Sequence, residues 1–325
     1  MQALQTHGVE SLDRLRLDEL PTPVPAAGQI RVRVQASAIA FVDLLLARGG
    51  YQLKPTLPFS PGSEYAGIVE AIGPDAATDL RPGDAVAGLM FVGAWRDQVC
   101  VEPRTVQRLP PGTPPEQGAL IPAPYATALY ALDQRGHLAP GETVLVLGAA
   151  GGVGWAAVQL AKALGARVIA AGSTAAKREA AREAGADEVV DVRDGGWKDA
   201  VKRLTGGRGV DVVVDPVGGE ATETAFRTLG WGGRHLVIGF AAGSIARLPA
   251  NLALLKGAAL VGVDVRQFGE RQPDAAAANL QRVFALYAQG RLLPRIAQVL
   301  PVAQYREAIA LAQAADTVGR VVLRF

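Results

Sequence analysis

A chain of 325 residues is longer than one average domain, and a composition of 49% hydrophobic and 20% charged residues indicates a globular protein, most simply with two domains. The net charge of +2 and the lack of a long basic run argue against a nucleic-acid partner. The single cysteine excludes an internal disulfide, and the N-terminus lacks the apolar core of a signal peptide, so we expect a cytoplasmic protein.

The first 120 residues or so are predicted to be rich in β-strands. Ile30, Val32 and Val34 alternate with polar residues at the period of a half-buried strand. Further short apolar runs follow up to residue 101, separated by turn signals such as Pro82-Gly83-Asp84. Many short strands with turns between them indicate a small barrel or sandwich. A proline-rich break at 109–115 then leads toward the domain junction, and a helix is expected over 119–132.

The stretch from Thr143 to Ala161 organises the rest of the chain. Apolar residues 144–147 predict a buried strand, and Gly148-Ala149-Ala150-Gly151-Gly152-Val153-Gly154 and a helix to Leu164 follow it. In this context a glycine motif binds a dinucleotide, because the first free amides of the helix point at the pyrophosphate. Read strictly as G-x-G-x-x-G, the motif starts at Ala149, so an ordinary strand–turn–helix unit is an alternative. The stretch is uncharged, but its glycines and its change of period argue against a membrane span.

From this point strands and helices alternate. Strands are expected at 144–147, 167–171, 188–191, 210–214, 234–238 and 259–263, with later helices at 175–184, 197–204 and 221–229. Such alternation predicts a doubly wound parallel sheet. Two amphipathic helices, at 275–289 and 302–315, precede a terminal strand at 321–323, which we expect to rejoin the sheet of the first domain.

Several short motifs accompany the glycine turn. They are Phe41-Val42-Asp43-Leu44, Gly49-Gly50-Tyr51, Leu57 to Glu64, Arg81 to Asp84, Tyr125 to Ala128, Asp211 to Asp215 and Gly232 to Arg234. Together they resemble the medium-chain dehydrogenase/reductase superfamily and, within it, the zinc-independent quinone oxidoreductases. The resemblance implies an α/β protein with a GroES-like β-rich catalytic domain, residues 1–123 and 265–325, and a Rossmann domain with a doubly wound parallel sheet, residues 124–264. That branch usually has an asparagine near the nicotinamide where this chain has Ala40.

The zinc enzymes of this superfamily use a cysteine and a histidine as first ligands. Where they read Gly-His-Glu, this chain reads Gly62-Ser63-Glu64, and a serine cannot replace the imidazole as a zinc ligand. We therefore expect no metal. Cys100 is interpreted as a core thiol, the scattered His7, His137 and His235 as surface or packing residues, and the glutamate as a structural residue held by hydrogen bonds.

The end of the second strand of the Rossmann sheet bears on the choice of cofactor. An NAD site usually carries an acid there that binds the ribose 2′-hydroxyl, whereas this chain has Ala170 to Thr174 without an acid. The absence of an acid, with Lys177 and Arg178 one turn later, favours NADP(H), because positive charge pairs with a 2′-phosphate. By resemblance, Ser173 and Lys177 hold that phosphate. Alternatively, the two cations form a solvated helix face.

The other expected site residues also follow from the resemblance. Cofactor contacts are Ala150, Gly151, Gly152 and Val153 of the turn, with Tyr51, Thr127, Gly239 and Phe240. The catalytic candidates are Tyr51 and Asp43. Thr127 could instead cap a helix, Phe240 could be only a core residue, and Tyr51 could simply cover the nicotinamide.

The expected activity is NADPH-dependent, metal-free hydride transfer to a quinone or another conjugated carbonyl. A 2-enoyl-thioester reductase, with Tyr51 as proton donor, is an alternative. A second alternative is an NADPH-binding structural protein with little turnover, as in relatives that accumulate in eye lenses. We expect a small-molecule substrate, no membrane partner and a homodimer, because the apolar strand 259–263 would lie at a sheet edge. A loop at 267–273 that covers this edge would leave a monomer instead.

Overall fold

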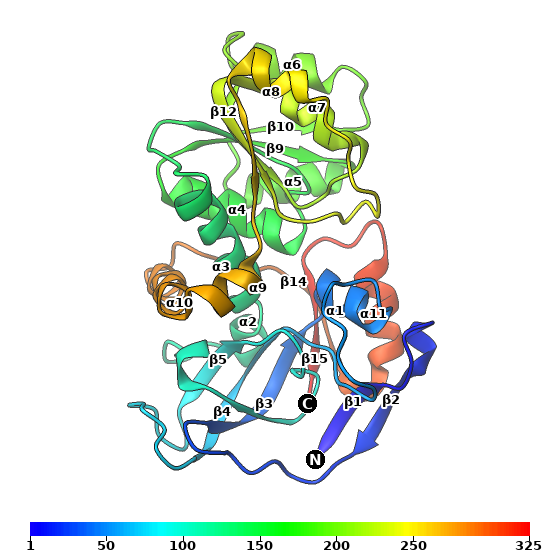
Figure 1. Ribbon diagram of the computed structural model, residues 1–325, viewed down its shortest axis with the longest axis vertical. Helices are drawn as coiled ribbons and strands as arrows, with labels where there is room; N and C mark the ends of the chain where they lie inside the picture. The colour runs from blue at the N-terminus through cyan, green and yellow to red at the C-terminus, as the bar shows by residue number, and fades with distance from the viewer. The chain divides into compact units, whose positions relative to one another are not determined.

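The computed structural model describes all 325 residues, which divide into two compact units (Figure 1). Unit 1 comprises Met1–Ala123, Gln272–Ala288 and Pro294–Phe325, and unit 2 comprises Pro124–Arg271 and Gln289–Leu293. The sequence-based division places residue 265 in the first domain. In the structure, Val265–Arg271 belongs to unit 2, where the ring of Phe268 stacks on that of Tyr130 with 4.0 Å between their centroids.

Unit 1 is built on a seven-stranded sheet in the order β14-β15-β3-β4-β5-β7, with β6 also paired to β3. Its strands are β3 (Ile30–Ala38), β4 (Glu64–Ile72), β5 (Ala85–Leu89), β6 (Gln98–Val101), β7 (Val106–Arg108), β14 (Ile296–Pro301) and β15 (Arg320–Arg324). The half-buried strand predicted at Ile30 is confirmed. So is the return of the chain terminus, because β15 pairs antiparallel with β3 and places Val322 opposite Ala38.

A second, two-stranded sheet and several short helices complete unit 1. They are β1 (Gln2–Thr6), β2 (Leu15–Glu19), η1 (Leu12–Arg14), α1 (Phe41–Ala47), η2 (Pro103–Thr105), α2 (Pro115–Gly118), α10 (Pro273–Ala288), η4 (Val302–Gln304) and α11 (Tyr305–Gln313). Strands β1, β2 and β14 and helix α1 were not expected from the sequence. Helix α1 has only seven residues, too few to show a clear helical period, yet it carries one of the catalytic candidates.

Unit 2 contains the predicted doubly wound sheet. Its six parallel strands run in the order β10-β9-β8-β11-β12-β13, so the strand order reverses between β8 and β11. The strands are β8 (Thr143–Val146), β9 (Arg167–Gly172), β10 (Glu188–Asp191), β11 (Val210–Asp215), β12 (Leu229–Val237) and β13 (Ala259–Gly262). The central strands are buried on both faces, which explains their continuous apolar runs.

Helices cover both faces of this sheet (Figure 1). The helices of unit 2 are α3 (Pro122–Leu129), η3 (Tyr130–Arg135, a π-helical turn), α4 (Gly152–Ala163), α5 (Ala175–Glu183), α6 (Trp197–Leu204), α7 (Glu220–Thr228), α8 (Ala250–Lys256) and α9 (Val265–Arg271), of which α4 to α8 pack on the sheet. Trp197 of α6, Phe226 of α7 and Leu252 of α8 share one buried cluster with the strands. No helix in the structure combines the length and the apolar character that a bilayer span requires.

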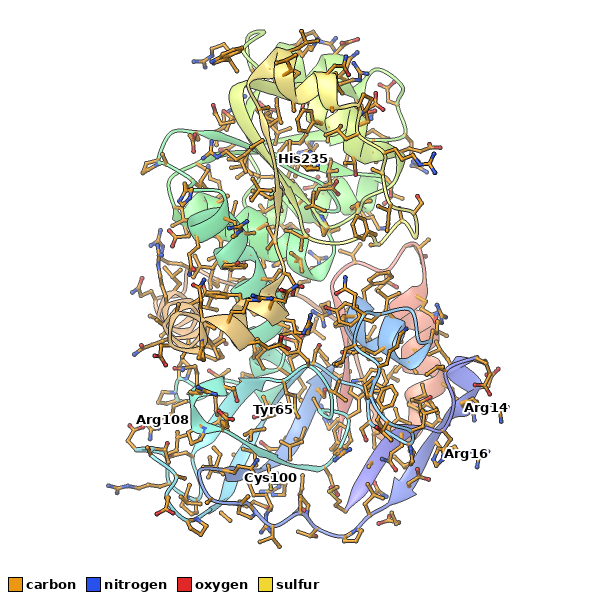
Figure 2. The ribbon with its side chains drawn as sticks, in the orientation of Figure 1. Arg14, Arg16, Tyr65, Cys100, Arg108 and His235 are labelled. Carbon is orange, nitrogen blue, oxygen red and sulfur yellow. The ribbon has the colours of Figure 1, made fainter.

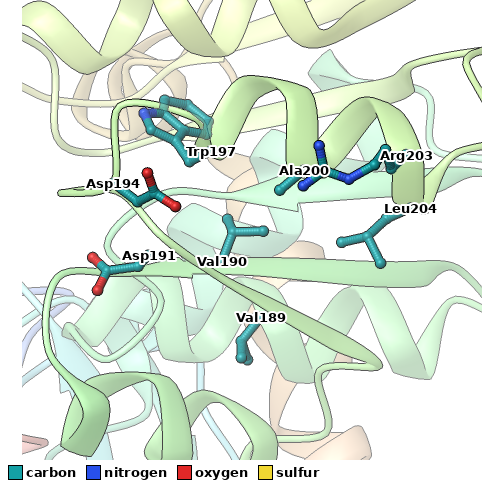
Figure 3. A pocket seen from close by; sticks show the side chains of 8 residues that line it. All are labelled: Val189, Val190, Asp191, Asp194, Trp197, Ala200, Arg203 and Leu204. Carbon is teal, nitrogen blue, oxygen red and sulfur yellow. The ribbon is translucent and has the colours of Figure 1, made fainter.

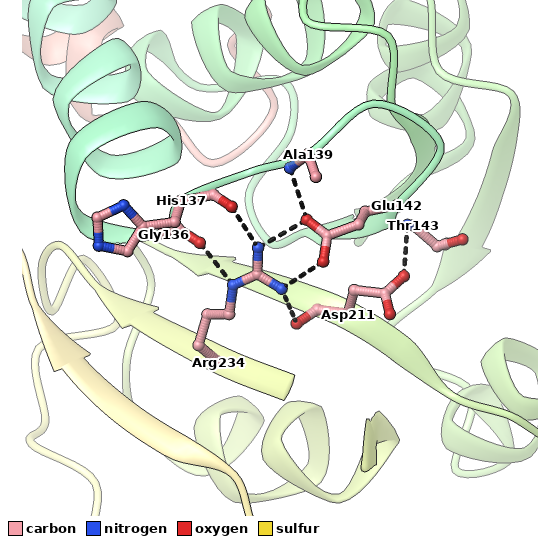
Figure 4. Close-up of polar contacts among 7 residues, drawn as sticks. All are labelled: Gly136, His137, Ala139, Glu142, Thr143, Asp211 and Arg234. Atoms are coloured by element: carbon pink, nitrogen blue, oxygen red, sulfur yellow. Dashed lines mark hydrogen bonds and ion pairs between the residues drawn. The ribbon is translucent and has the colours of Figure 1, made fainter. Parts of the chain in front are cut away.

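At the amino-terminal edge of the same sheet, Arg234 bonds Glu142 and the turn that precedes β8 (Figure 4). The guanidinium of Arg234 forms a bidentate pair with Glu142, with both N–O distances 2.6 Å. It also donates to the carbonyls of Gly136 and His137, at 2.5 and 2.9 Å. The side chains of Arg234 and Glu142 are only 17% and 24% exposed. The pair therefore holds the turn that leads from η3 into β8, in which His137 adopts a φ of 45°.

Candidate functional site

The glycine turn lies at the carboxyl end of β8, beside the point where the strand order reverses. Gly148 has a φ of 58°, which favours glycine, and Gly151 is the N-cap of α4 without any side-chain cap. A Cβ at Gly154 would clash with the carbonyl oxygen of Gly148. The turn therefore uses Gly148 where the strict motif begins at Ala149, which explains its irregular spacing.

The uncapped start of α4 fits an anion. No side chain covers the first helical amides, and those amides have no intrahelical partner. The helix dipole adds partial positive charge at the same place. Gly151 is exposed, and Gly152 and Val153 are partly exposed, so a phosphate can approach the backbone.

At the carboxyl end of β9, one of the two expected cations is paired within the protein and the other is not. The hydroxyl of Thr174 accepts a hydrogen bond from the amide of Lys177 (3.2 Å) and so caps α5. The ammonium of Lys177 itself has neither a hydrogen bond nor an ion pair. The guanidinium of Arg178, in contrast, is paired with Asp191 at 2.7 Å and donates to the carbonyl of Gly172.

Asp191 is the residue that the sequence analysis missed here. It ends β10, and the sheet register places it opposite Gly172 at the end of β9. The acid that an NAD site has on the second strand is thus found on the third strand, where a cation neutralises it. An amide hydrogen bond from Arg193, with the nearby cations Arg178 and Arg193, lowers the pKa of Asp191. Lys177 and the hydroxyl of Ser173 remain available for a ligand.

The loop after β12 carries Gly239 and Phe240 and pairs with the loop after β11. Its amides at Ala241 and Ala242 donate to the carbonyls of Pro216 and Val217, at 3.2 and 2.8 Å. Phe240 is 38% exposed, so the alternative that it is only a core residue is wrong. Thr127 is the sixth residue of α3, well past the first turn, so the alternative that it caps a helix is also wrong.

In unit 1, α1 holds Asp43 in a fully buried position. One carboxylate oxygen accepts the amide of Ala40 (2.7 Å), while the other oxygen has no partner. Burial raises the pKa of Asp43 to about 7, although the amide of Ala40, the nearby side chain of Ser63 and the positive charge of Arg320 oppose this, while the negative charge of Glu64 adds to the rise. Because Ala40 has no polar side chain, the carboxyl group of Asp43 is the only side chain that caps the start of α1.

Glu64 lies in the same buried region and is held as the sequence predicts. Its carboxylate accepts a hydrogen bond from Arg320 (2.7 Å) and another from the amide of Ala123 (2.9 Å). Burial raises its pKa, and the guanidinium of Arg320 works against that rise. These contacts are structural.

Tyr51 follows α1 in a loop tied to the end of that helix. Gly49 has a φ of 62°, and the amide of Gly50 donates to the carbonyl of Leu45 (2.8 Å). The ammonium of Lys54 donates to the carbonyl of Gly49. Helix α1 therefore connects the two catalytic candidates, with Asp43 in its first turn and Tyr51 just beyond its last.

The candidate metal ligands are dispersed. Ser63 is buried, His7 bonds Asp18 (2.6 Å), and His235 lies inside unit 2 (Figure 2). Cys100 is partly exposed, so its interpretation as a core thiol is wrong, because the strand alternation turns its neighbours inward instead. No group of three or more His, Cys, Asp or Glu side chains is placed to hold a metal ion.

An open pocket of about 410 Å³ lies beside β10 and α6 (Figure 3). Asp191, Trp197 and Arg203 are among the residues that line it. None of the site residues expected from the sequence lines it, but Asp191, which pairs with Arg178 at the carboxyl end of β9, does, so the pocket adjoins that end of the sheet.

Comparisons with known proteins agree with this architecture. Residues 26–111 match the family described as alcohol dehydrogenase GroES-like domain, and residues 152–282 match the family described as zinc-binding dehydrogenase. Quinone oxidoreductase-like protein 2 of Rattus norvegicus is 35% identical over 304 residues, which cover 93% of this chain and 86% of the rat protein. A mycobacterial protein solved in complex with NADPH is 29% identical with a TM-score of 0.92, and the match covers 100% of both chains. The CurK enoyl reductase is 26% identical with a TM-score of 0.89, covering 99% of this chain and 98% of that one.

Proposed function

The chain belongs to the quinone oxidoreductase branch of the medium-chain dehydrogenase/reductase superfamily, and we propose that it is an NADPH-dependent, metal-free reductase of quinones or other conjugated carbonyls. The observation that carries the cofactor assignment is the carboxyl edge of the unit 2 sheet. An uncapped helix start lies after β8, and an unpaired cation lies after β9 where an NAD site would carry an acid. The similarity to a protein solved with NADPH supports the same assignment.

We assign residues at the carboxyl edge of the unit 2 sheet to the separate parts of NADPH. The backbone from Ala150 to Val153 takes the pyrophosphate, because its amides lie at the uncapped start of α4. Ser173 and Lys177 take the 2′-phosphate, and the bond is charge-assisted. Gly239 and Phe240 contact the nicotinamide half. By resemblance, Tyr51 and Thr127 are the remaining contacts.

The bound nicotinamide would supply the hydride. The side chains and backbone of the protein must then activate the substrate carbonyl without a Lewis acid. Ser63 stands where the zinc enzymes have a histidine ligand, so the protein has to act by orienting the substrate, excluding water and donating hydrogen bonds to the developing oxyanion. The proton comes from water or from the hydroxyl of Tyr51. Asp43 is fully buried, so we assign it a positioning role through α1 and the loop that carries Tyr51.

Reduction of a 2-enoyl thioester is the second candidate function. The similarity to the CurK enoyl reductase over nearly the whole chain favours it. In this reaction Tyr51 would protonate the carbanion that forms next to the thioester. An NADPH-binding structural protein with little turnover is the remaining alternative.

We also propose a homodimer that forms through β13. This strand ends the sheet and stays uncovered, with Leu260 51% exposed. The segment 267–273 belongs to α9 and the start of α10 and leaves β13 exposed, so the alternative of a covered edge is not what the structure has. Trp231, which is 83% exposed and packs on Gly257, adds apolar surface to the same part of unit 2. An exposed apolar edge strand is a site for pairing with a second chain.

The test compares three acceptors under one set of conditions. NADPH oxidation is followed by its absorbance with 1,4-benzoquinone, 9,10-phenanthrenequinone and crotonyl-CoA in turn. Faster turnover of the quinones supports the proposal, and faster turnover of crotonyl-CoA assigns the thioester reductase instead. No turnover of any acceptor, with tight NADPH binding, would favour the structural protein. Gly152→Asp is the control, because its carboxylate against the pyrophosphate should abolish cofactor binding.

A further inference from the structure

Asp215 has a fully satisfied, buried carboxylate at the centre of the carboxyl edge of unit 2. It is the last residue of β11, directly beside the point where the strand order reverses. One oxygen accepts the amides of Val217 and Gly218, at 2.9 and 2.8 Å. The other accepts the hydroxyl of Thr222 (2.6 Å) and Nε2 of His235 (2.9 Å). Such a saturated carboxylate fixes every group that donates to it.

The donors come from three different elements. The two amides belong to the loop after β11, Thr222 lies in the first turn of α7, and His235 lies inside β12. His235 is fully buried, and its Nδ1 has no partner, so the bond to Asp215 holds its proton on Nε2. Burial disfavours the charged carboxylate, but the bonds from His235, Thr222 and Gly218 lower the pKa of Asp215 overall.

The loop that Asp215 shapes supports the loop after β12. Besides the two amide bonds from Ala241 and Ala242, the amide of Gly219 donates to the carbonyl of Ser244 (3.0 Å). Gly218 has a φ of 70°, and a Cβ at that position would clash with Phe240. A change in the loop after β11 would therefore move the loop that carries Gly239 and Phe240.

The same loop also touches the glycine turn. A Cβ at Gly148 would lie 2.9 Å from a methyl group of Val217, so the turn after β8 packs closely on the loop after β11. In a doubly wound sheet, the two mononucleotide halves of a dinucleotide lie on either side of the reversal point. Because the phosphate-binding groups of β8 and β9 occupy one side, the loops after β11 and β12 occupy the side of the nicotinamide half.

We infer that Asp215, through Thr222 and His235, positions the two loops that receive the nicotinamide half of the cofactor, while the adenosine half depends on β8 and β9. This inference rests on the proposed function, because it assumes that the edge binds NADPH. It makes Asp215 and its two partners positioning residues, since buried side chains cannot themselves touch the cofactor.

The test removes one donor without changing the shape of the side chain. Thr222→Val deletes the hydroxyl, and Thr222→Ser, the matched control, keeps it. Each protein is titrated calorimetrically with NADPH and with adenosine 2′,5′-bisphosphate, which lacks the nicotinamide half. We expect Thr222→Val to weaken NADPH about tenfold while the bisphosphate binds as in the wild type, since a bond to a charged acceptor is lost only on the nicotinamide side. Thr222→Ser should bind both ligands normally.

A second variant breaks the contact between the two loops from the side of the loop after β12. Ala242 is exposed, and Ala242→Pro removes the amide that bonds Val217 without opening the core. It should show the same selective loss of NADPH affinity. Equal weakening of both ligands, or no change in either, in the folded variants would overturn the inference. A wild-type protein that binds neither ligand would instead overturn the proposed function, on which the inference depends.

Discussion

Asp43→Asn should make the stability of the protein less dependent on pH. The wild-type carboxyl group is buried, and its pKa is raised from 3.8 to about 7. Asparagine has nearly the same shape, and its oxygen can still accept the amide of Ala40, which starts α1. The substitution therefore removes the titration while it keeps the cap.

The direction in which the free energy of unfolding changes with pH follows from the binding of one proton to Asp43. Between these two pKa values the folded state holds the proton on Asp43 and the unfolded state does not, so the free energy of unfolding falls as pH rises. The difference of roughly three pKa units at about 1.4 kcal/mol each gives a loss on the order of 4 kcal/mol across the window. The loss is complete above the folded-state pKa, and below pH 4 or so this group has no effect.

Urea unfolding, followed by circular dichroism at several pH values from about 4 to 8, measures this loss. Glu64 is also buried with a raised pKa, and its negative charge adds to the rise at Asp43, so the difference between wild type and variant reports the titration of Asp43 together with its interaction with Glu64. The gap between the two proteins should widen in favour of the variant as pH rises. Parallel stability curves would show that Asp43 is ionised in the folded protein throughout and that burial does not dominate its pKa.

Three other substitutions test separate parts of the structure. Lys177→Ala should weaken NADPH by about 1.5–3 kcal/mol, or one to two decades in affinity, and hardly affect NADH; equal weakening in calorimetric titrations would mean that Lys177 is a solvated surface residue. Arg234→Met should lower the free energy of unfolding by about 2–3 kcal/mol, because it leaves Glu142 without its bidentate partner. A thermal unfolding midpoint equal to that of the wild type would show that the ion pair contributes little to stability. Leu260→Pro removes a backbone donor on the open side of the edge strand β13, since the amides of residues 261 and 263 face β12, and light scattering coupled to size exclusion should then find monomers in place of wild-type dimers. A wild-type protein that is monomeric at micromolar concentration, or a folded proline variant that stays dimeric, would exclude this interface.

The elements of unit 2 could be predicted from the sequence because each signal is local. Residues 144–147 are apolar enough to need burial on both faces, and the glycines after them fit only a close turn. The later strands each contain a short apolar run, although β12 begins at Leu229, five residues before the predicted strand, and the alternation with helices determines the sheet type. The closing strand β15 was predictable for the same reason, since Val321 to Leu323 must be buried.

What the sequence could not predict are contacts between elements that lie far apart in the chain. Nothing local reveals that Arg178 is paired with Asp191, because that pair depends on the register of β9 against β10. The bond from His235 to Asp215 likewise joins residues of two strands, β11 and β12, that only the folded sheet brings side by side. Both cases change the interpretation of the site. The first removes Arg178 from the two cations expected to bind phosphate, and the second adds a buried hydrogen-bond network around Asp215.

The central claim is NADPH-dependent reduction without a metal, and one time course tests it most directly. The protein is dialysed against EDTA, its zinc content is measured, and NADPH oxidation with 9,10-phenanthrenequinone is recorded before and after dialysis. The account predicts zinc well below one equivalent per chain and an unchanged rate, because Ser63 replaces the histidine ligand of the zinc enzymes. A rate that is lost on dialysis and restored by added zinc would contradict it.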